Sequence, residues 1–273
     1  MDSDQIGVAA AIKQFLATKE ERREATKDNL EQRLGLWPGQ LEPGRKVHDV
    51  STAELEAWLL TYIPQNRKNY RSALHGFFTW AVKIGAAPEN PVTDVEIPEV
   101  KGKRPSYLHP ADVQAMLKVA LEQERRDTVT WIVLGAFCGL RPFESFRVEW
   151  HAIKRERQEI RIETEWSKIK RPRTFELTDL AMAWISIIPE GDPGDKILGH
   201  TEDEWNNKWQ EWRKENAGKR GVPPWKLWQQ PKSKDILRHT YITFRVADTD
   251  NEPLVAKEAG TSVEVIHAQA TTA

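Results

Sequence analysis

The sequence is short of cysteine and of long apolar runs, and each shortage excludes a class of protein. Its 273 residues contain a single cysteine, Cys138, so no disulfide framework can form and a reducing compartment is expected. The longest apolar stretch, near residues 131–138, is too short to span a bilayer. The first residues carry no basic stretch followed by an apolar run, so no secretory signal is expected. These features predict a cytoplasmic protein that does not enter a membrane.

The sequence also has little net charge, and it has no motif for a metal or a nucleotide. The net charge of −1 does not by itself indicate a nucleic-acid partner. The charges are nevertheless segregated, because residues 151–173 and 208–238 are rich in Lys and Arg whereas residues 248–273 are acidic. Basic runs are typical of solvated faces and of DNA-binding surfaces, so charge alone leaves both alternatives open. No metal and no cofactor are expected.

The sequence does contain enough apolar material, including 12 Trp, to build a core. Residues 1–95 predict four amphipathic helices that form a small bundle as a first domain. Ser51 and Glu54 have the spacing of a capping box, which predicts that a helix begins there. The apolar residues expected on the inward faces are Ile12, Phe15, Leu16, Leu30, Leu34, Leu55, Trp58, Leu59, Tyr62, Tyr70, Leu74, Phe77, Phe78 and Ala81.

Residues 96–106 predict an interdomain linker, because they are poor in apolar residues and rich in helix breakers. Lys101, Lys103 and Arg104 within it would suit contacts along a DNA phosphate backbone, and an ordinary loop is the alternative. Residues 107–273 then predict a second domain. The first of its expected helices begins near Pro110. The others cover residues 127–138, 178–186, 202–216, 236–247, 252–258 and 262–268.

One part of the second domain predicts β-structure. Apolar and polar residues alternate on both sides of a basic turn at residues 167–173, which is typical of a β-hairpin. In the expected helix 202–216, Trp205, Trp209 and Trp212 form one stripe, which we predict to be core rather than a platform for stacked bases. The predicted fold class is therefore mainly α with a small β-hairpin or sheet, in which the second domain is α+β.

Three separated segments of the second domain share a pattern. Arg141 follows Gly139 and Leu140 and precedes Glu144 by three residues. The basic turn at residues 167–173 comes next, and Arg238 and His239 stand near the start of a later predicted helix. In order and spacing, these segments resemble the arginine boxes and the hairpin lysine of the tyrosine recombinases, also called the phage integrase family.

This resemblance implies a helical, SAM-like core-binding domain followed by a recombinase catalytic domain. It implies DNA recombination and DNA integration by a mobile element, through cleavage and rejoining of double-stranded DNA and a 3′-phosphotyrosyl intermediate. It also implies a homo-oligomer on DNA, which is a tetramer in the family. The type IB topoisomerases share the constellation, but the two-domain layout fits the integrases better.

The resemblance also implies roles for individual residues. Arg141 and Arg238 would hold the non-bridging oxygens of the cleaved phosphate bidentately, where charge develops in the transition state. Glu144 would orient Arg141. Lys168 would protonate the leaving 5′ oxygen, and Lys170 is the alternative for that role. The residues of the turn expected to contact DNA are Lys170, Arg171 and Arg173.

The sequence departs from the family pattern around Arg238. Asp235 stands where the family usually has a histidine, and it cannot supply a cationic donor. His239 matches the arginine–histidine pair of the family, with a packed helix histidine as the alternative reading. Thr261 follows Gly260 where the family usually has histidine or tryptophan, and its hydroxyl could still donate one hydrogen bond to the phosphate.

The largest departure concerns the nucleophile. The tyrosine of the family is expected about nine residues beyond Thr261, and that position is Ala270. No tyrosine follows Tyr241 in the sequence, and His267 is a weak substitute. We therefore predict a C-terminally truncated catalytic domain and a recombinase deficient in cleavage. The alternatives are a non-catalytic DNA-binding regulator derived from an integrase, or a helical protein in which the three segments are coincidental.

Overall fold

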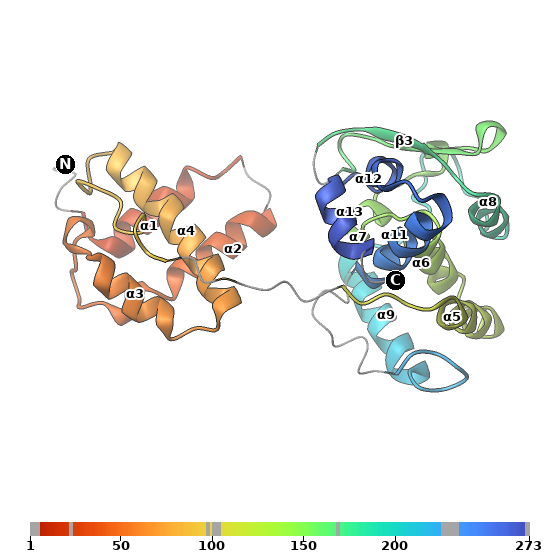
Figure 1. Cartoon of the computed structure of the whole chain (residues 1–273), viewed down its shortest axis with the longest axis horizontal. Helices are drawn as coiled ribbons and strands as arrows, with labels where there is room; N and C mark the ends of the chain where they lie inside the picture. The colour runs from red at the N-terminus through yellow and green to blue at the C-terminus, as the bar shows by residue number, and fades with distance from the viewer. Residues whose placement is uncertain are drawn as a thin grey trace. The chain divides into compact units, whose positions relative to one another are not determined.

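The structure, a computed structural model, describes residues 6–21, 24–96, 99, 105–167, 170–224 and 235–270. The chain divides into two compact units, residues 1–102 and 103–273 (Figure 1). The described residues are mainly helical and include one three-stranded sheet, which confirms the predicted fold class. Across the described ranges, no helix is both long enough and apolar enough to cross a membrane.

The first unit is a bundle of four helices, as predicted. Ser51 begins the third helix through a capping box, since its hydroxyl accepts from the Glu54 amide and the Glu54 carboxylate accepts from the Ser51 amide at 2.9 Å. Trp37, Phe77 and Phe78 are almost fully buried at the centre of the bundle, where their rings meet edge to face. The helices are α1 (Val8–Ala17), α2 (Glu24–Gly35), α3 (Thr52–Leu60) and α4 (Pro64–Lys83), with short 3-10 turns at Pro38–Gln40 and Val47–Asp49.

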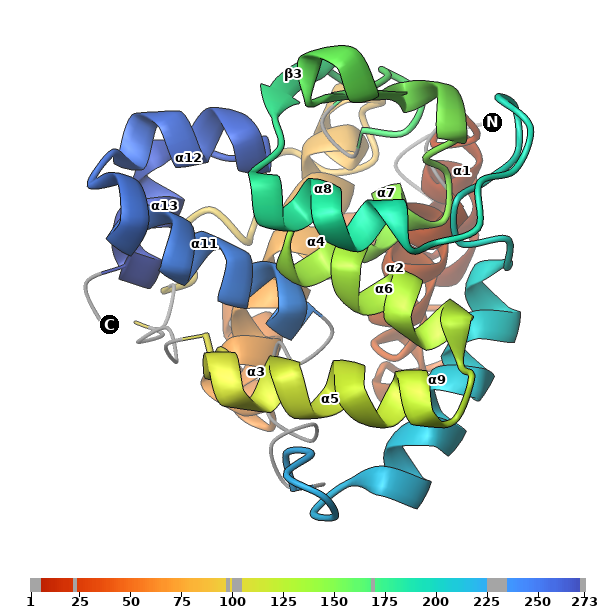
Figure 2. The same cartoon turned by 90° about the vertical axis from the view of Figure 1, so that its right-hand side faces the viewer.

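The second unit packs helices against a small sheet. Figure 2 shows the sheet along one edge of this unit and α5 along the opposite edge, with α6 and α11 between them. The short helix α7 was not predicted, because four residues are too few to show a period. The helices are α5 (Pro110–Glu122), α6 (Arg126–Ala136), α7 (Pro142–Ser145), α8 (Asp179–Ser186), α9 (Glu202–Asn216), α11 (Ile236–Thr249), α12 (Glu252–Ala259) and α13 (Val263–Ala270).

The sheet contains the predicted hairpin and one further strand. β2 (Glu159–Ile162) pairs antiparallel with β3 (Arg173–Glu176), with Ile160 opposite Phe175. Both of these side chains are buried, whereas Arg161 and Thr174 on the opposite face are exposed. The two-residue strand β1 (Ile153–Lys154) adds to the other edge of β2, and it is preceded and followed by 3-10 turns at Trp150–Ala152 and Arg155–Arg157.

The tryptophan stripe of α9 belongs to the core. Trp205 and Trp212 are fully buried, and Trp209 is nearly so. The Trp209 and Trp212 rings stack almost in parallel with centroids 5.4 Å apart, while Trp205 lies against Trp131 of α6. The Trp212 indole N–H donates to Gln123 at 2.8 Å, so its polar atom is satisfied in the interior. The prediction of a core role for this stripe is confirmed.

Gly139 turns the chain between α6 and α7, and its conformation requires glycine. Its φ is +64°, and a Cβ at this position would meet the ring of Tyr241. We expect Gly139→Ala to destabilise the protein by about 3 kcal/mol, because strain and overpacking add. Urea unfolding measures this loss. Gly194→Ala is the control, since a Cβ added there would meet no atom within 4 Å, and an equal effect of both variants would contradict the prediction.

Candidate functional site

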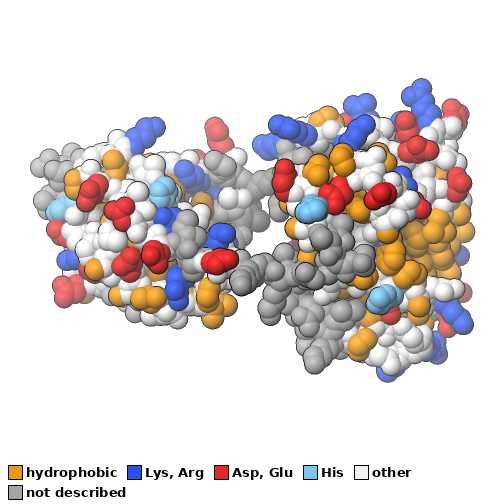
Figure 3. All heavy atoms as spheres, viewed as in Figure 1, with side chains coloured by type: hydrophobic (Ala, Val, Ile, Leu, Met, Phe, Trp, Pro, Cys, Tyr) orange, Lys and Arg blue, Asp and Glu red, His pale blue; other side chains and the backbone are white. Residues whose placement is uncertain are grey.

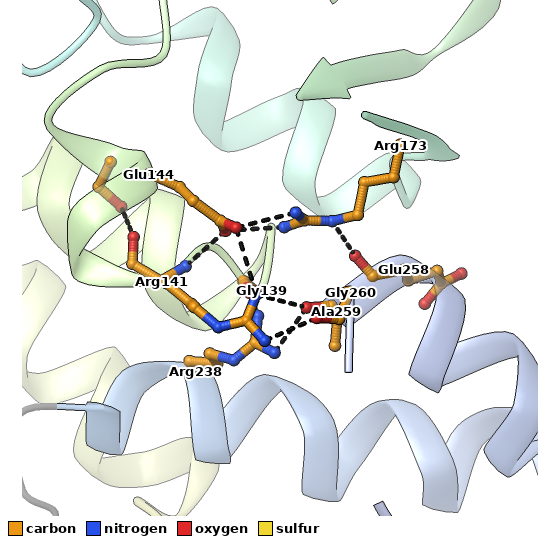
Figure 4. Close-up of polar contacts among 9 residues, drawn as sticks. Gly139, Arg141, Glu144, Arg173, Arg238, Glu258, Ala259 and Gly260 are labelled. Atoms are coloured by element: carbon orange, nitrogen blue, oxygen red, sulfur yellow. Dashed lines mark hydrogen bonds and ion pairs between the residues drawn. The ribbon is translucent and has the colours of Figure 1, made fainter. Parts of the chain in front are cut away.

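Two arginines that are far apart in the sequence converge on one end of α12 (Figure 4). Arg238 donates from Nη2 to the carbonyl of Ala259 at 2.6 Å and from Nη1 to the carbonyl of Gly139 at 2.6 Å. Arg141 donates from Nη1 to the same Ala259 carbonyl at 3.3 Å and from Nη2 to the carbonyl of Gly260 at 2.6 Å. The two predicted phosphate-binding residues therefore share one acceptor.

Helix ends explain why the arginines gather there. The last carbonyls of a helix have no partner within it and carry the negative end of the helix dipole, so they attract guanidinium groups. Gly260 ends α12 in the left-handed conformation, with φ of +59°. On the other side, Arg141 is the N-cap of α7, which Pro142 and Glu144 begin in the manner typical of a first helical turn.

Glu144 is a buried carboxylate that ties this cluster together. It accepts from the Arg141 amide at 2.9 Å and from Arg141 Nη1 at 3.2 Å. It also accepts both ends of the Arg173 guanidinium, at 2.8 and 2.7 Å. Burial raises the pKa of Glu144, but hydrogen bonds and charge from Arg173 and then Arg141 outweigh it, so the net pKa lies below the usual value. The carboxylate is therefore ionised, which suits the predicted role of orienting Arg141.

Arg173 is the residue for which the structure gives a different reading from the sequence. The prediction was a DNA contact at the hairpin, but its side chain is only 7% exposed. Besides gripping Glu144, it donates from Nε to the carbonyl of Glu258 at 2.9 Å. It stands on β3 two residues before the buried Phe175, so strand alternation turns it toward the interior, a signal that was available in the sequence. Its geometry is that of a positioning residue for Glu144.

The site carries a surplus of positive charge. Arg141 and Arg173 both bind the carboxylate of Glu144, and Arg238, which is 5% exposed, shares the Ala259 carbonyl with Arg141. Burial, and then the like charge of Arg141, lower the pKa of Arg238 to about 9, while Glu144 and Asp235 act in the opposite direction. The guanidinium remains protonated at neutral pH. An anion placed against Arg141 and Arg238 would relieve their mutual repulsion.

Two of the residues at which the sequence departs from the family pattern, Asp235 and Thr261, lie close to this cluster. Asp235 is the N-cap of α11, three residues before Arg238, and its charge favours the protonated form of that arginine. Thr261 follows directly after Gly260, whose carbonyl binds Arg141. His239 lies buried within α11.

The basic residues predicted to contact DNA are only partly described. Lys170 and Arg171 are exposed at the hairpin turn, and Figure 3 shows Lys and Arg side chains along the edge of this unit that carries the sheet. Lys168, the predicted general acid, lies outside the described residues, and so do Lys101, Lys103 and Arg104.

No described side chain offers an obvious nucleophile at the arginine pair. Ala270 is the last residue of α13, and its side chain is not described. His267 Nδ1 lies 3.0 Å from the carboxylate of Glu252, which is the first residue of α12. The arginines bind carbonyls at the other end of this helix, which is roughly 10 Å long at 1.5 Å per residue. The Tyr241 hydroxyl donates to the Glu258 carboxylate at 2.7 Å. Burial raises the pKa of Tyr241 above its usual value, so its hydroxyl stays protonated at neutral pH.

The chain is similar in sequence to curated tyrosine recombinases. No family model matches the chain. Among curated proteins it is similar to the tyrosine recombinase XerD of Pseudomonas aeruginosa, with 26% identity over 54% of this chain and 50% of that protein. It is also similar to the tyrosine recombinase XerD of Pseudomonas putida, with 25% identity over 68% of this chain and 64% of that protein. The alignments thus span between half and two thirds of these relatives.

Solved structures share the fold over nearly the whole chain. A lambda integrase dimer bound to a COC′ core site superposes with a TM-score of 0.74 at 16% identity, covering 96% of this chain and 94% of that one. The Tn1549 transposon integrase in complex with transposon right-end DNA gives a TM-score of 0.70 at 14% identity, covering 97% and 95%. In sequence the chain is similar to tyrosine recombinases, and it shares the fold of the solved integrases. The two arginines that meet at the end of α12 come from the two segments that resemble the arginine boxes of the tyrosine recombinases.

Proposed function

We propose that this chain binds double-stranded DNA as a tyrosine recombinase does, with Arg141 and Arg238 holding one backbone phosphate, and that it does not cleave the strand as written. The observation that carries the proposal is the shared acceptor, because Arg141 and Arg238 both donate to the Ala259 carbonyl and so lie side by side. Two adjacent guanidinium forks match the oxygens of a phosphodiester.

The preorganisation of the pair supports the same role. Glu144 fixes Arg141 from one side, and the carbonyls at the end of α12 fix both guanidiniums from the other. Donors that are already in place need little reorganisation when charge builds on the phosphate oxygens. The exposed Lys170 and Arg171 at the hairpin turn would contact the phosphates on either side.

The cleavage step needs a nucleophile, and position 270, where the resemblance predicts it, carries alanine. In the family mechanism a tyrosine oxygen attacks the phosphorus, the 5′ oxygen leaves, and a lysine that corresponds to Lys168 supplies its proton. The methyl group of Ala270 has no lone pair to offer. This residue favours the second candidate function, a non-catalytic regulator that occupies recombination sites. The similar lambda integrase structure is a dimer bound to its core site, and the similar Tn1549 integrase structure is a complex with DNA. We therefore also propose that this chain forms homo-oligomers on DNA.

Binding to duplex DNA from the flanks of the gene, measured over a salt series with random-sequence competitor, tests the proposal. The affinity is expected to fall steeply with salt, because each neutralised phosphate releases counterions. The double variant Lys170→Ala and Arg171→Ala is expected to lower the slope of log K against log salt by about 1.8, at about 0.9 per phosphate contact.

The control for this experiment is Arg220→Ala, which removes an exposed arginine that pairs with Glu122. Its slope should equal that of the unchanged protein. Absence of binding at low salt would exclude the proposed function. A slope that the hairpin variant leaves unchanged would exclude the hairpin as part of the interface.

A further inference from the structure

A buried carboxylate that lies outside the predicted site anchors the helix that holds the arginines. Glu258 of α12 is 2% exposed. Its carboxylate accepts from the Tyr241 hydroxyl at 2.7 Å and from Arg245 Nε and Nη2 at 3.1 and 3.0 Å. Both partners belong to α11, which also carries Arg238. Three donors on one helix therefore lock one side chain of the next.

The backbone of the same residue faces the arginine cluster. The Glu258 carbonyl accepts from Arg173, and the carbonyls of Ala259 and Gly260 that follow it accept from the two phosphate-binding arginines. Figure 4 shows these three consecutive carbonyls together at the end of α12. Any shift in this turn would move the acceptors of all three guanidiniums at once.

Both apolar packing and the bonds of Glu258 hold helix α12 in position. Eight residues are too few for a stable helix without tertiary contacts. The buried apolar side chains of α12, Val255, Ala256 and Ala259, pack in one core cluster with residues of α11 and α13. Such packing has no preferred direction. Alanine buries little area, so its contribution is smaller than that of larger apolar residues. The charge-assisted bonds of Glu258 add a directional restraint that ties this turn to α11.

We infer that Glu258 is a positioning residue for Arg141 and Arg238, which acts by fixing the last turn of α12 to α11 through Tyr241 and Arg245. The use of the arginines for phosphate rests on the proposed function, but their fixation does not. A purely structural buried ion pair would stabilise the whole unit without any particular effect on the two arginines. A measurement that compares Arg141 and Arg238 with an arginine elsewhere in the unit therefore distinguishes the two roles.

Hydrogen exchange of the arginine guanidinium protons, measured by NMR on the full chain without DNA, provides that measurement. Arg125, which donates to Asp127 at 3.1 Å from the start of α6, is the internal reference. In Glu258→Gln we expect exchange at Arg141 and Arg238 to accelerate about tenfold relative to Arg125, which corresponds to about 1.4 kcal/mol of local opening. Tyr241→Phe keeps the ring against Gly139 and should give a smaller acceleration in the same direction.

Asp248→Asn is the matched control, because it removes the exposed second partner of Arg245 and leaves Glu258 intact. It should leave all three arginines unchanged. Equal acceleration at Arg141, Arg238 and Arg125 would overturn the inference and leave Glu258 with a general stabilising role. Unchanged exchange at Arg141 and Arg238 in either variant would also overturn it. Since no DNA is present, a failure to bind DNA would count against the proposed function alone.

Discussion

Replacing Ala270 by tyrosine is expected to give a chain that forms a covalent complex with its DNA site, which the proposed function does not allow for the unchanged chain. The substitution supplies a phenolic oxygen at the position where the resemblance predicts the nucleophile, while the arginine pair and Glu144 are already in place. Loss of a nucleophile from an assembled site costs about 10⁶ in rate in a well-studied hydrolase, so a gain of several orders of magnitude is expected.

A nicked substrate that traps the covalent intermediate measures this gain, because the protein–DNA complex survives denaturing electrophoresis. Ala270→Phe is the matched control, since it adds the ring without the hydroxyl and should form no complex. Adding Arg238→Ala to Ala270→Tyr should abolish the complex again. If Ala270→Tyr binds DNA with full affinity and forms no complex, the recombinase proposal is wrong and the regulator alternative is favoured.

Glu144→Ala is expected to lower the free energy of unfolding by about 3–5 kcal/mol, because it leaves the guanidiniums of Arg173 and Arg141 in a buried site without their carboxylate. Equilibrium urea unfolding measures the loss. Glu163→Ala is the control, since Glu163 pairs with Arg161 at the surface and such pairs contribute about 0–1 kcal/mol. Equal losses in the two variants would contradict the buried network.

The same carboxylate predicts a pH dependence. The pKa of Glu144 is lowered in the folded state, so its contribution is fully present above the unfolded pKa of about 4.3 and is lost as pH falls through the folded value. As pH falls below about 4.3, the unchanged protein should therefore lose stability more steeply than Glu144→Gln, which has no carboxylate to protonate there. Parallel pH profiles for the two proteins would show that Glu144 is not held ionised.

The helices and the hairpin were predictable because local signals and tertiary packing agree in this chain. Leu74, Phe77 and Phe78 recur at helical spacing and lie in the core of the first unit. The alternation around Ile160 and Phe175 predicted the hairpin and its inward face. The features that were missed are short, namely α7 and β1, because elements of four and two residues show no period.

The sequence by itself determined which residue types stand in which order: the boxes around Arg141 and Arg238, the basic turn between them, and alanine at position 270. It could not determine that the partner of Arg173 is Glu144 or that the Glu258 carboxylate binds Tyr241, because both contacts join residues that are distant in the chain. Only the tertiary structure decided how the arginines meet, since their common acceptor is a backbone carbonyl. Every residue has such a carbonyl, so no sequence pattern marks it, and its availability arises only from where α12 ends.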